Sequence, residues 1–431
     1  MLAGLILLLV SQPPEFAPVD HKVLPKLTAV HEEGPLIFHY DAASLDAPTL
    51  KADVQRNLGF FRYLEKAMRM KYRGRIRIFL YKDMSEMQAF TGSKAAAFST
   101  GTSSIHQAHD YDDAHEMVHI FALQIPKGDD HVDPGPLFVE GLATTLQEED
   151  NGIAINDYTA IAYRIGRIPR LVPLRRTFPE GAPPGVHPYH VAGTFMGFLI
   201  DRYGMEKVKS LYVNCLECEG RLGKSFATLE SEWWPWLGKL KVRTDTEKKL
   251  LARFGFGDAH RLPAKLQKAK RVSLFDGRSL NGWNLEHPQS WRVQKKLIVG
   301  ATDGAWHRMH SQEGFQDTAV RVRLRLVSGN AIQIRLNRTA TTANEAILAT
   351  WMAYLVRVGP GGGVKKQAPY HILPGRWIDV VFENKGGHGT VWIDGLKMLE
   401  ADGLGTENGA VGISVERGVV EVSSIERLVV K

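Results

Sequence analysis

The spacing of apolar residues changes near residue 270, and this change constrains the fold more than any other feature of the sequence. Before it, apolar residues recur at helical intervals, for example in 45–71 at Val54, Leu58, Phe61, Leu64 and Met68. After it, apolar and polar residues alternate, as in 320–326, where valines and leucines alternate with arginines. A helix repeats every 3.6 residues and a strand every two. The sequence therefore predicts an α+β domain followed by an antiparallel β-sandwich.

Local patterns place the elements of the first domain. Strands are expected at 35–40, 75–81 and 103–108. Helices are expected at 45–71, from Asp83 onward, and at 112–125, 136–148, 189–203 and 205–213. At 431 residues the chain is too long for one ordinary domain of roughly 100–200 residues. We expect a signal segment at 1–20, the α+β domain at 30–240, a basic and partly helical linker at 241–271, and the sandwich at 272–431.

Composition excludes several classes of protein. Hydrophobic residues make up 44% and charged residues 23% of the chain, which argues against wholesale disorder. No apolar run approaches the roughly 20 residues that span a bilayer, so a polytopic membrane protein is excluded. The net charge of +7 is spread along the chain, and its densest block, 265–271, is typical of a solvated linker. Nucleic acid is therefore not expected as a partner.

The N-terminus and the two cysteines bear on the compartment. The apolar run 2–10, followed by Pro13 and Pro14, has the length of a signal-peptide core, so we expect a secreted, periplasmic or cell-surface protein. A start inside a longer signal and a hydrophobic tail remain alternatives. Cys215 and Cys218 form a Cys-x-x-Cys pair, which would be a local disulfide or two idle thiols, a redox pair, or half a zinc site.

The segment His115-Glu116-Met117-Val118-His119 carries the chemistry of the first domain. Residues four apart on a helix lie one turn above each other, so both imidazoles would face one metal ion. Glu116 is rotated by about 100° from His115, where it reaches a water without displacing a ligand. Surface histidines beside a capping box would be the structural alternative, but the apolar residues between and after them indicate a buried helix.

A carboxylate in the next helix completes the set. Glu140 lies in the apolar run 136–144, and a lone buried carboxylate is unstable unless it is paired or bound to metal. Gly141 and Ala143 are small, so this helix would approach the first closely. Two histidines and one glutamate leave a fourth position for water, which is the arrangement of a catalytic Zn²⁺ site. A pair of Glu140 with Lys or Arg is the alternative.

HEMVH, with the glutamate of FVEG following after 20 intervening residues, resembles the gluzincin-type zinc metallopeptidases, over roughly residues 30–240. The resemblance implies a zincin-like catalytic domain in which His115, His119 and Glu140 hold Zn²⁺ and Glu116 is the general base. A peptide or protein substrate is then expected, and the strand at 103–108 would pair with it.

Other site residues follow with less support from the sequence. Tyr189 and His190 are the candidate donors to the developing oxyanion, since such families commonly supply a Tyr or His from a later helix. Asp112, Asp113 and Thr144 are candidate partners of the metal ligands, with a capping or solvated role as the alternative.

The string Ser273-Leu-Phe-Asp-Gly-Arg-Ser-Leu-Asn-Gly-Trp283 resembles the opening of the 3-keto-disaccharide hydrolase domain, a concanavalin- or laminin-G-like jelly roll common in exported bacterial proteins. The resemblance covers 272–431 and departs after Gly329, where the chain reads NAIQIR. Six tryptophans would stack on sugar rings or belong to the core: Trp283, Trp291, Trp306, Trp351, Trp377 and Trp392. The arginines of 321–325 would meet acidic glycans or simply be solvated.

These patterns predict an exported zinc metallohydrolase, in first place a peptidase, with a C-terminal sandwich that recognises carbohydrate. Two alternatives remain open. One is a sugar hydrolase of the 3-keto-glycoside type whose activity lies in the sandwich. The other is a non-catalytic surface-binding protein.

Overall fold

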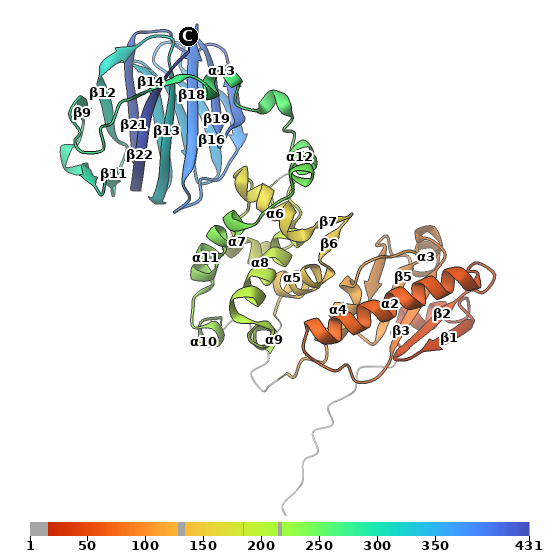
Figure 1. The fold of residues 1–431 in the computed structure, drawn as a ribbon. Coiled ribbons are helices and arrows are strands. Elements are labelled where there is room, and N and C mark those ends of the chain that lie inside the picture. Colours follow the sequence, from red (N-terminus) through yellow and green to blue (C-terminus); the bar gives the residue numbers. More distant parts are fainter. Residues whose placement is uncertain (1–15, 128–133, 184, 214–217, 431) are drawn as a thin grey trace, which may run out of the picture. The chain divides into compact units, whose positions relative to one another are not determined.

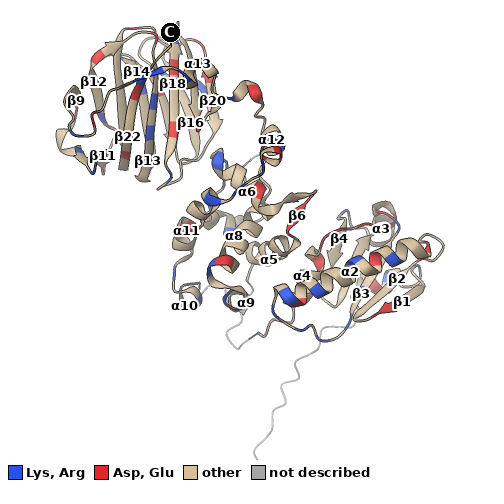
Figure 2. Ribbon diagram, viewed as in Figure 1, with Lys and Arg blue, Asp and Glu red and all other residues tan. Residues whose placement is uncertain are grey.

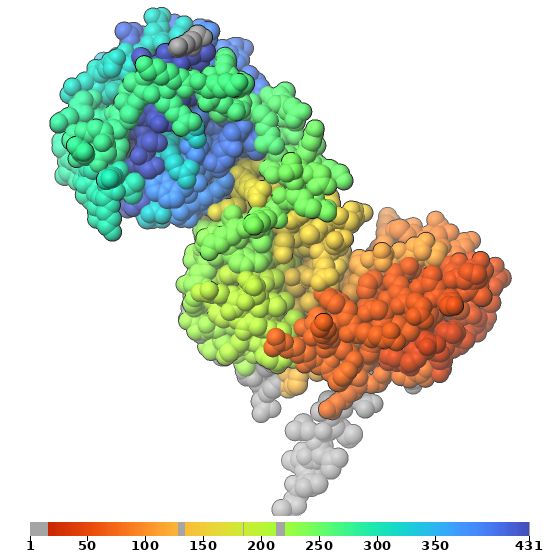
Figure 3. All heavy atoms as spheres, in the orientation of Figure 1, coloured from red at the N-terminus to blue at the C-terminus, as the bar shows by residue number. Residues whose placement is uncertain are grey.

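The change in apolar spacing near residue 270 separates two kinds of architecture in the computed structural model (Figure 1). The structure describes residues 16–127, 134–183, 185–213 and 218–430. They form two compact units, each closely packed (Figure 3). The first unit comprises the chain up to 156 with 171–180 and 187–233, and the second comprises 157–170, 181–186 and the chain from 234 onward. Cys215 and the expected signal segment up to residue 15 lie outside the described residues.

A five-stranded mixed sheet begins the first unit. Its strands follow the order β1 (Ala29–Glu33), β2 (Leu36–Tyr40), β3 (Ile76–Tyr81), β5 (Ser104–Ala108) and β4 (Ala97–Ser99). The strands β2, β3 and β5 are parallel, and the outer strands β1 and β4 are antiparallel to their neighbours. The strands predicted at 35–40, 75–81 and 103–108 are thus confirmed, whereas β1 and β4 are additional.

The position of β5 within the sheet contradicts the expectation that it pairs with a peptide. It lies between β3 and β4, and all five of its residues are buried. Both of its hydrogen-bonding edges are therefore occupied. The strand β4 has a single neighbour in the described sheet and is the edge strand. A strand's place in a sheet depends on contacts distant in sequence, so the local pattern did not reveal it.

Helices surround this sheet and continue beyond it. Asp46 begins α2 (Ala47–Ala67) by accepting a hydrogen bond from the Thr49 N–H, and the predicted apolar face is buried. The helices predicted at 112–125, 136–148, 189–203 and 205–213 are confirmed to within three residues at each end. The helices other than α2 up to residue 239 are α1 (Pro18–Val23), α3 (Met84–Thr91), α4 (His115–Ala122), α5 (Pro136–Gln147), α6 (Ile155–Arg164), α7 (Leu171–Thr177), α8 (Pro188–Tyr203), α9 (Met205–Val213), α10 (Cys218–Leu222) and α11 (Phe226–Lys239).

Asp20 shows that the last residues of the expected signal segment are folded. It lies on α1, is fully buried, and has its Oδ1 2.8 Å from His106 Nε2 on β5. The other ring nitrogen of His106 lies 2.8 Å from the Tyr81 hydroxyl. Residues 18–23 are therefore tied to the sheet by a buried hydrogen-bonded chain.

The helices α5 and α8 approach each other through glycines. A Cβ atom on Gly141 would lie 2.8 Å from the Ala192 carbonyl oxygen, and one on Gly193 would lie 2.8 Å from the Thr144 Cγ2 atom. The expectation that Gly141 allows α5 to approach α4 is wrong, because Gly141 faces α8 instead. The small residue fixes the distance between α5 and α8, the two helices that carry Glu140 and Tyr189.

From β8 onward, the second unit is an antiparallel β-sandwich, as predicted. One sheet has the order β10-β11-β22-β13-β18-β19-β20, with β8 paired to β22, and the other has the order β17-β16-β15-β14-β21-β12-β9. The strands are β8 (Lys270–Ser273), β9 (Trp283–Leu285), β10 (Trp291–Gln294), β11 (Leu297–Thr302), β12 (His307–Phe315), β13 (Ala319–Ser328), β14 (Ala331–Arg338), β15 (Ala343–Ala349), β16 (Met352–Val358), β17 (Gly363–Pro369), β18 (Ile378–Lys385), β19 (His388–Ile393), β20 (Leu396–Ala401), β21 (Gly409–Glu416) and β22 (Gly418–Val429).

The alternating strand β13 illustrates how the sandwich is built. Its valines and leucines at 320–326 are fully buried. Its arginines form the basic row on this strand in Figure 2. Arg321 and Arg323 lie 3.0 and 2.7 Å from Asp379, and Arg325 lies 2.6 Å from Glu421. These arginines are paired within the sheet, which leaves little free positive charge for an acidic glycan.

The segment 241–271, predicted as a linker, is folded. It forms α12 (Thr244–Arg253) and α13 (Ala264–Gln267) and leads into β8. Leu250 and Leu251 are buried, and Leu266 packs against Trp392 and Leu428 of the sandwich. The many lysines and arginines of 241–271 are typical of a solvated linker, so the sequence pattern did not predict that its apolar residues are buried. No helix within the described ranges is long and apolar enough to cross a membrane.

The close approach of α5 and α8 predicts a difference between two identical substitutions. Gly141→Ala should lower the free energy of unfolding by about 1–3 kcal/mol, because the new methyl group meets backbone at 2.8 Å. Gly59→Ala on α2 is the matched control, since nothing lies within 4 Å of its Cβ position. It should raise stability by about 0.5–1 kcal/mol. Urea unfolding measures both, and equal effects would contradict the packing described.

Candidate metal centre

The helix α4 brings two imidazoles to one side. It begins where Asp113 Oδ1 accepts the His115 backbone N–H at 2.9 Å. Its apolar residues, including Val118 and Phe121, are buried in the unit. His115 and His119 lie one turn apart with ring centroids 4.9 Å from each other, and both line an open pocket. The helical spacing thus has the geometric consequence expected from the sequence.

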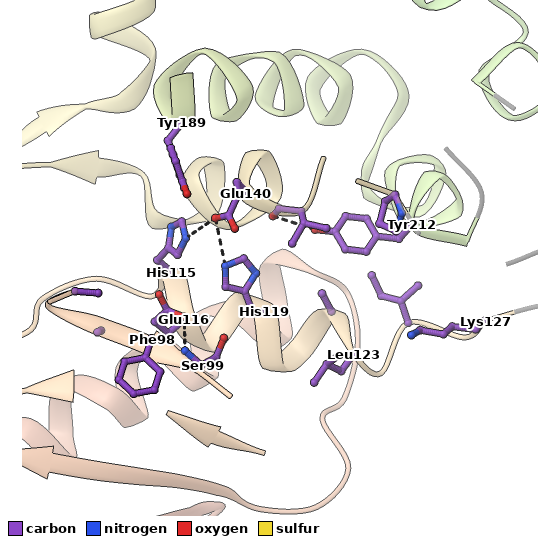
Figure 4. A pocket seen from close by; sticks show the side chains of 16 residues that line it. Phe98, Ser99, His115, Glu116, His119, Leu123, Lys127, Glu140, Tyr189 and Tyr212 are labelled. Carbon is purple, nitrogen blue, oxygen red and sulfur yellow. Dashed lines mark hydrogen bonds and ion pairs between the residues drawn. The ribbon is translucent and has the colours of Figure 1, made fainter. Parts of the chain in front are cut away.

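Glu140 on α5 completes a three-residue cluster with these imidazoles (Figure 4). Its Oε2 lies 3.1 Å from His115 Nε2 and 3.5 Å from His119 Nε2. Donor atoms about 2.0–2.2 Å from a tetrahedral zinc ion lie about 3.3 Å from one another. The three side chains therefore fit a zinc ion in both chemistry and spacing.

The electrostatics of the cluster favour a charged carboxylate beside a charged imidazole. Burial disfavours the charged form of Glu140, but the hydrogen bonds with His115 and His119 outweigh it and lower its pKa to about 2. Burial also works against a charged His115, but Glu140 and Glu116 outweigh it and raise the pKa of this imidazole. A positive charge is thus stabilised where the three donors meet.

One further cluster of potential ligands occurs in the part of the chain that the structure describes. It consists of Asp53, His109 and Asp110. The His109 ring nitrogens lie 2.8 Å from Asp53 and 2.8 Å from Asp110, and the guanidinium of Arg56 is paired with Asp53. An arginine beside these carboxylates already supplies the positive charge, so this cluster is an ion-pair network.

Glu116 lies on the pocket wall next to the three donors. Its Oε2 accepts a hydrogen bond from the Ser99 backbone N–H at 2.7 Å (Figure 4). Ser99 is the last residue of the edge strand β4, and Phe98 and Ser99 line the same pocket. The carboxylate is therefore held between the helix that carries the histidines and the edge of the sheet. The sequence offered no signal for the contribution of Ser99, which is a backbone N–H.

Tyr189 and His190, predicted together, are separated by the fold. Tyr189 lines the pocket, its ring lies 6.3 Å from that of His115, and its hydroxyl points toward Glu140 in Figure 4. Burial, with the charges of Glu140 and Glu116, raises its pKa, so the hydroxyl remains a hydrogen-bond donor. His190 is not among the residues lining the pocket, and its Nε2 lies 2.9 Å from Asp150 Oδ2. The structure therefore does not bring His190 to the candidate metal centre.

The residues expected to support the ligands also differ in role. Asp113 begins α4, as noted above, and burial raises its pKa. Asp112 is 80% exposed and lies 4.0 Å from Arg56. Thr144 packs against the Gly193 position of α8. The side chain that reaches a ligand ring is instead Gln147, with Oε1 3.3 Å from His115 Nδ1. Its position seven residues after Glu140, on the same face of the helix, is the signal that could have found it.

The pocket continues beyond the donors and has a volume of about 590 Å³. Tyr212 is another lining residue that the sequence did not indicate. Its hydroxyl donates to the Val139 carbonyl at 3.1 Å and thereby stabilises the position of α5. The end of the pocket beyond His119 is apolar apart from Lys127 and is lined by Ala122, Leu123, Ile125, Pro134 and Val139. This end of the pocket can bury an apolar part of a ligand.

A second hollow, of about 520 Å³, lies on the sandwich. It is lined by Trp306, Trp351 and Tyr354, with Glu416 and Asn330 as polar groups. Trp351 is 60% exposed. Three of the other tryptophans predicted to stack on sugars are buried in the core instead: Trp283, Trp291 and Trp392. Trp377 lies under the guanidinium of Arg325, 4.9 Å from ring centroid to Cζ.

Comparisons with known proteins bear on the sandwich. Residues 270–426 match the family model of the 3-keto-alpha-glucoside-1,2-lyase-like domain. This part of the chain is similar to that domain, and the matched range does not include the candidate metal centre. A search of curated proteins found no match.

Two solved structures illustrate the structural neighbours. The carbohydrate-binding module CBM66 from Bacillus subtilis has 14% identity and a TM-score of 0.32, over 34% of this chain and 95% of that chain. The beta-glucanase of Bacillus licheniformis has 8% identity and a TM-score of 0.33, over 38% of this chain and 100% of that chain.

The geometry of the donors predicts a specific metal content. Purified protein loaded with zinc should hold about one ion per chain, and Glu140→Ala should lose it or bind it far more weakly, because one of three ligands is removed. Elemental analysis after equilibrium dialysis measures the content. Glu149→Ala, which removes an exposed carboxylate on the following hairpin, is the control and should retain zinc. Equal zinc in Glu140→Ala and in the control would contradict the three-ligand site.

Proposed function

We propose that the first unit is a zincin-like, zinc-dependent hydrolase that cleaves peptide bonds. The observation that carries this proposal is the meeting of His115, His119 and Glu140 at one point of an open pocket, with Glu116 on its wall. Two imidazoles and one carboxylate are a ligand set of catalytic rather than structural zinc. When bound, zinc lowers the pKa of a water molecule toward neutrality and polarises a carbonyl oxygen.

The groups around the three candidate ligands supply proton transfer and hydrogen bonding in the proposed reaction. Glu116 accepts a proton at its carboxylate as the water oxygen bonds to the carbonyl carbon, and it returns that proton to the amine nitrogen when the C–N bond breaks. The N–H of Ser99 orients this carboxylate. Tyr189, which keeps its proton, donates a hydrogen bond to the oxygen that becomes negative.

The walls of the pocket support an extended peptide as the substrate. The edge strand β4 borders the pocket, and an extended chain can add to such an edge through main-chain hydrogen bonds. The apolar end formed by Leu123, Ile125 and Val139 suits an apolar side chain next to the bond that is cleaved.

Glu116→Gln is the direct test of this proposal. It removes the proton acceptor while the three metal ligands stay, so peptide hydrolysis should fall by at least about 10²–10⁴-fold with zinc retained. A fluorogenic peptide library and elemental analysis measure the two quantities. Glu86→Gln, far from the ligands in sequence and on α3, is the control. Unchanged proteolysis in Glu116→Gln would refute the peptidase proposal.

The family match supports a second function, located in the sandwich. We propose that the second unit binds carbohydrate through the hollow lined by Trp306, Trp351 and Tyr354, and that the protein acts outside the cytoplasm on glycan-bearing material. The exposed ring of Trp351 beside polar Asn330 and Glu416 is the arrangement that a sugar requires: an aromatic face with hydroxyl partners around it. Hydrolysis of a 3-keto-type sugar at this domain is the alternative that the match to residues 270–426 favours.

Trp351→Ala tests the sandwich site. Loss of the stacking face should weaken binding of an oligosaccharide by about tenfold, since such a contact contributes about 1.5 kcal/mol. Trp377→Ala removes a tryptophan that lies under Arg325, outside the hollow, and should leave binding unchanged. Glycan arrays followed by calorimetry provide the measurement. Full binding or sugar cleavage by Trp351→Ala would place the site elsewhere on the sandwich, and neither outcome depends on Glu116.

A further inference from the structure

Gln147, the last residue of α5, contacts the candidate metal ligand His115. Gln147 Oε1 lies 3.3 Å from His115 Nδ1, on the side of the ring opposite to Glu140. Gln147 Nε2 donates to the Glu149 backbone carbonyl at 2.9 Å. The amide therefore bridges an imidazole of α4 and the strand β6 (Glu149–Asp150).

The second of these hydrogen bonds decides the orientation of the amide. A carbonyl oxygen only accepts, so the group facing Glu149 must be the NH₂ of Gln147. The oxygen of the amide then faces His115, and an oxygen accepts a proton from the nitrogen it meets. The hydrogen bond thus favours the form of His115 that carries a proton on Nδ1. In that form, the lone pair on Nε2 is directed toward Glu140 and the position of the ion.

Local backbone geometry keeps Gln147 in this place. Glu148 has a φ of +69°, which reverses the chain directly after α5. The reversal starts the short hairpin of β6 and β7 (Ile153–Ala154) and turns the Glu149 carbonyl back toward the helix end. The same helix therefore supplies the carboxylate ligand and, two turns later, the group that orients the histidine ligand.

We infer that Gln147 is a positioning residue of the metal centre, which holds His115 in the tautomer and ring orientation that bind a zinc ion. This inference rests on the proposed zinc site. An acceptor on the far nitrogen of a ligand histidine raises its basicity and limits its rotation, and loss of such a partner weakens metal binding by about 10–100-fold. Glu140 and Gln147 then act from one rigid helix on both sides of the same imidazole.

The experiment compares zinc affinities in the full chain by competition with a chromophoric chelator, without any substrate. Gln147→Leu removes the acceptor and should weaken zinc binding about 10–100-fold. Gln147→Glu retains an acceptor oxygen and should bind zinc at least as tightly as the parent. Gln55→Leu makes the same exchange at an exposed position of α2 and should have no effect.

The outcomes separate this inference from the proposed function. A parent that binds one zinc, with Gln147→Leu equal to it, would overturn the role of Gln147 and leave the zinc site standing. A parent that binds no zinc would overturn both. Melting curves of the metal-free proteins check folding, and Gln147→Met, which keeps the unbranched side chain, replaces the leucine variant if the latter is unstable.

Discussion

The hydrogen bonds between Glu140 and the two imidazoles of α4 are the interaction on which the site of the first unit depends. A partly buried carboxylate is unstable as an ion unless donors or a cation face it. His115 and His119 supply those donors and lower the pKa of Glu140 to about 2. The same three side chains suit a divalent cation, because a cation in their midst would replace the protons that now hold them together. The arrangement that pairs these side chains is thus also one that suits a metal ion.

Packing between α5 and α8 extends this arrangement to the rest of the pocket. The contact at Gly141 sets how far the helix with Tyr189 lies from the helix with Glu140. Tyr212 adds a hydrogen bond to the Val139 carbonyl, and the chain reversal after α5 directs Gln147 to His115. These supports lie at different points of a single helix. Displacement of α5 would therefore disturb the carboxylate, the orientation of His115 and the apolar end of the pocket together.

The sandwich is built on a different physical basis from the first unit. Its core comes from strands whose inward residues are aliphatic or aromatic, which accounts for three of the six tryptophans. Trp306 and Trp351 lie instead at a hollow, where an aromatic face beside polar groups matches the alternating polar and apolar surface of a sugar. The family match at 270–426 is consistent with that use. Neither feature depends on a metal ion.

The sequence by itself determined the features that depend only on residues close together in the chain. The helical spacing of HEMVH places His115 and His119 on one side of α4, and the alternation at 320–326 specifies a strand with one buried face, because both follow from the repeat of the local backbone. Tertiary structure decided the rest. Adjacent residues on a helix point about 100° apart, so the rotation of α8 against α5 sends Tyr189 to the pocket and His190 to Asp150. Similarly, β5 became interior because β4 pairs with its remaining edge. Such outcomes depend on contacts between distant segments, which local spacing does not encode.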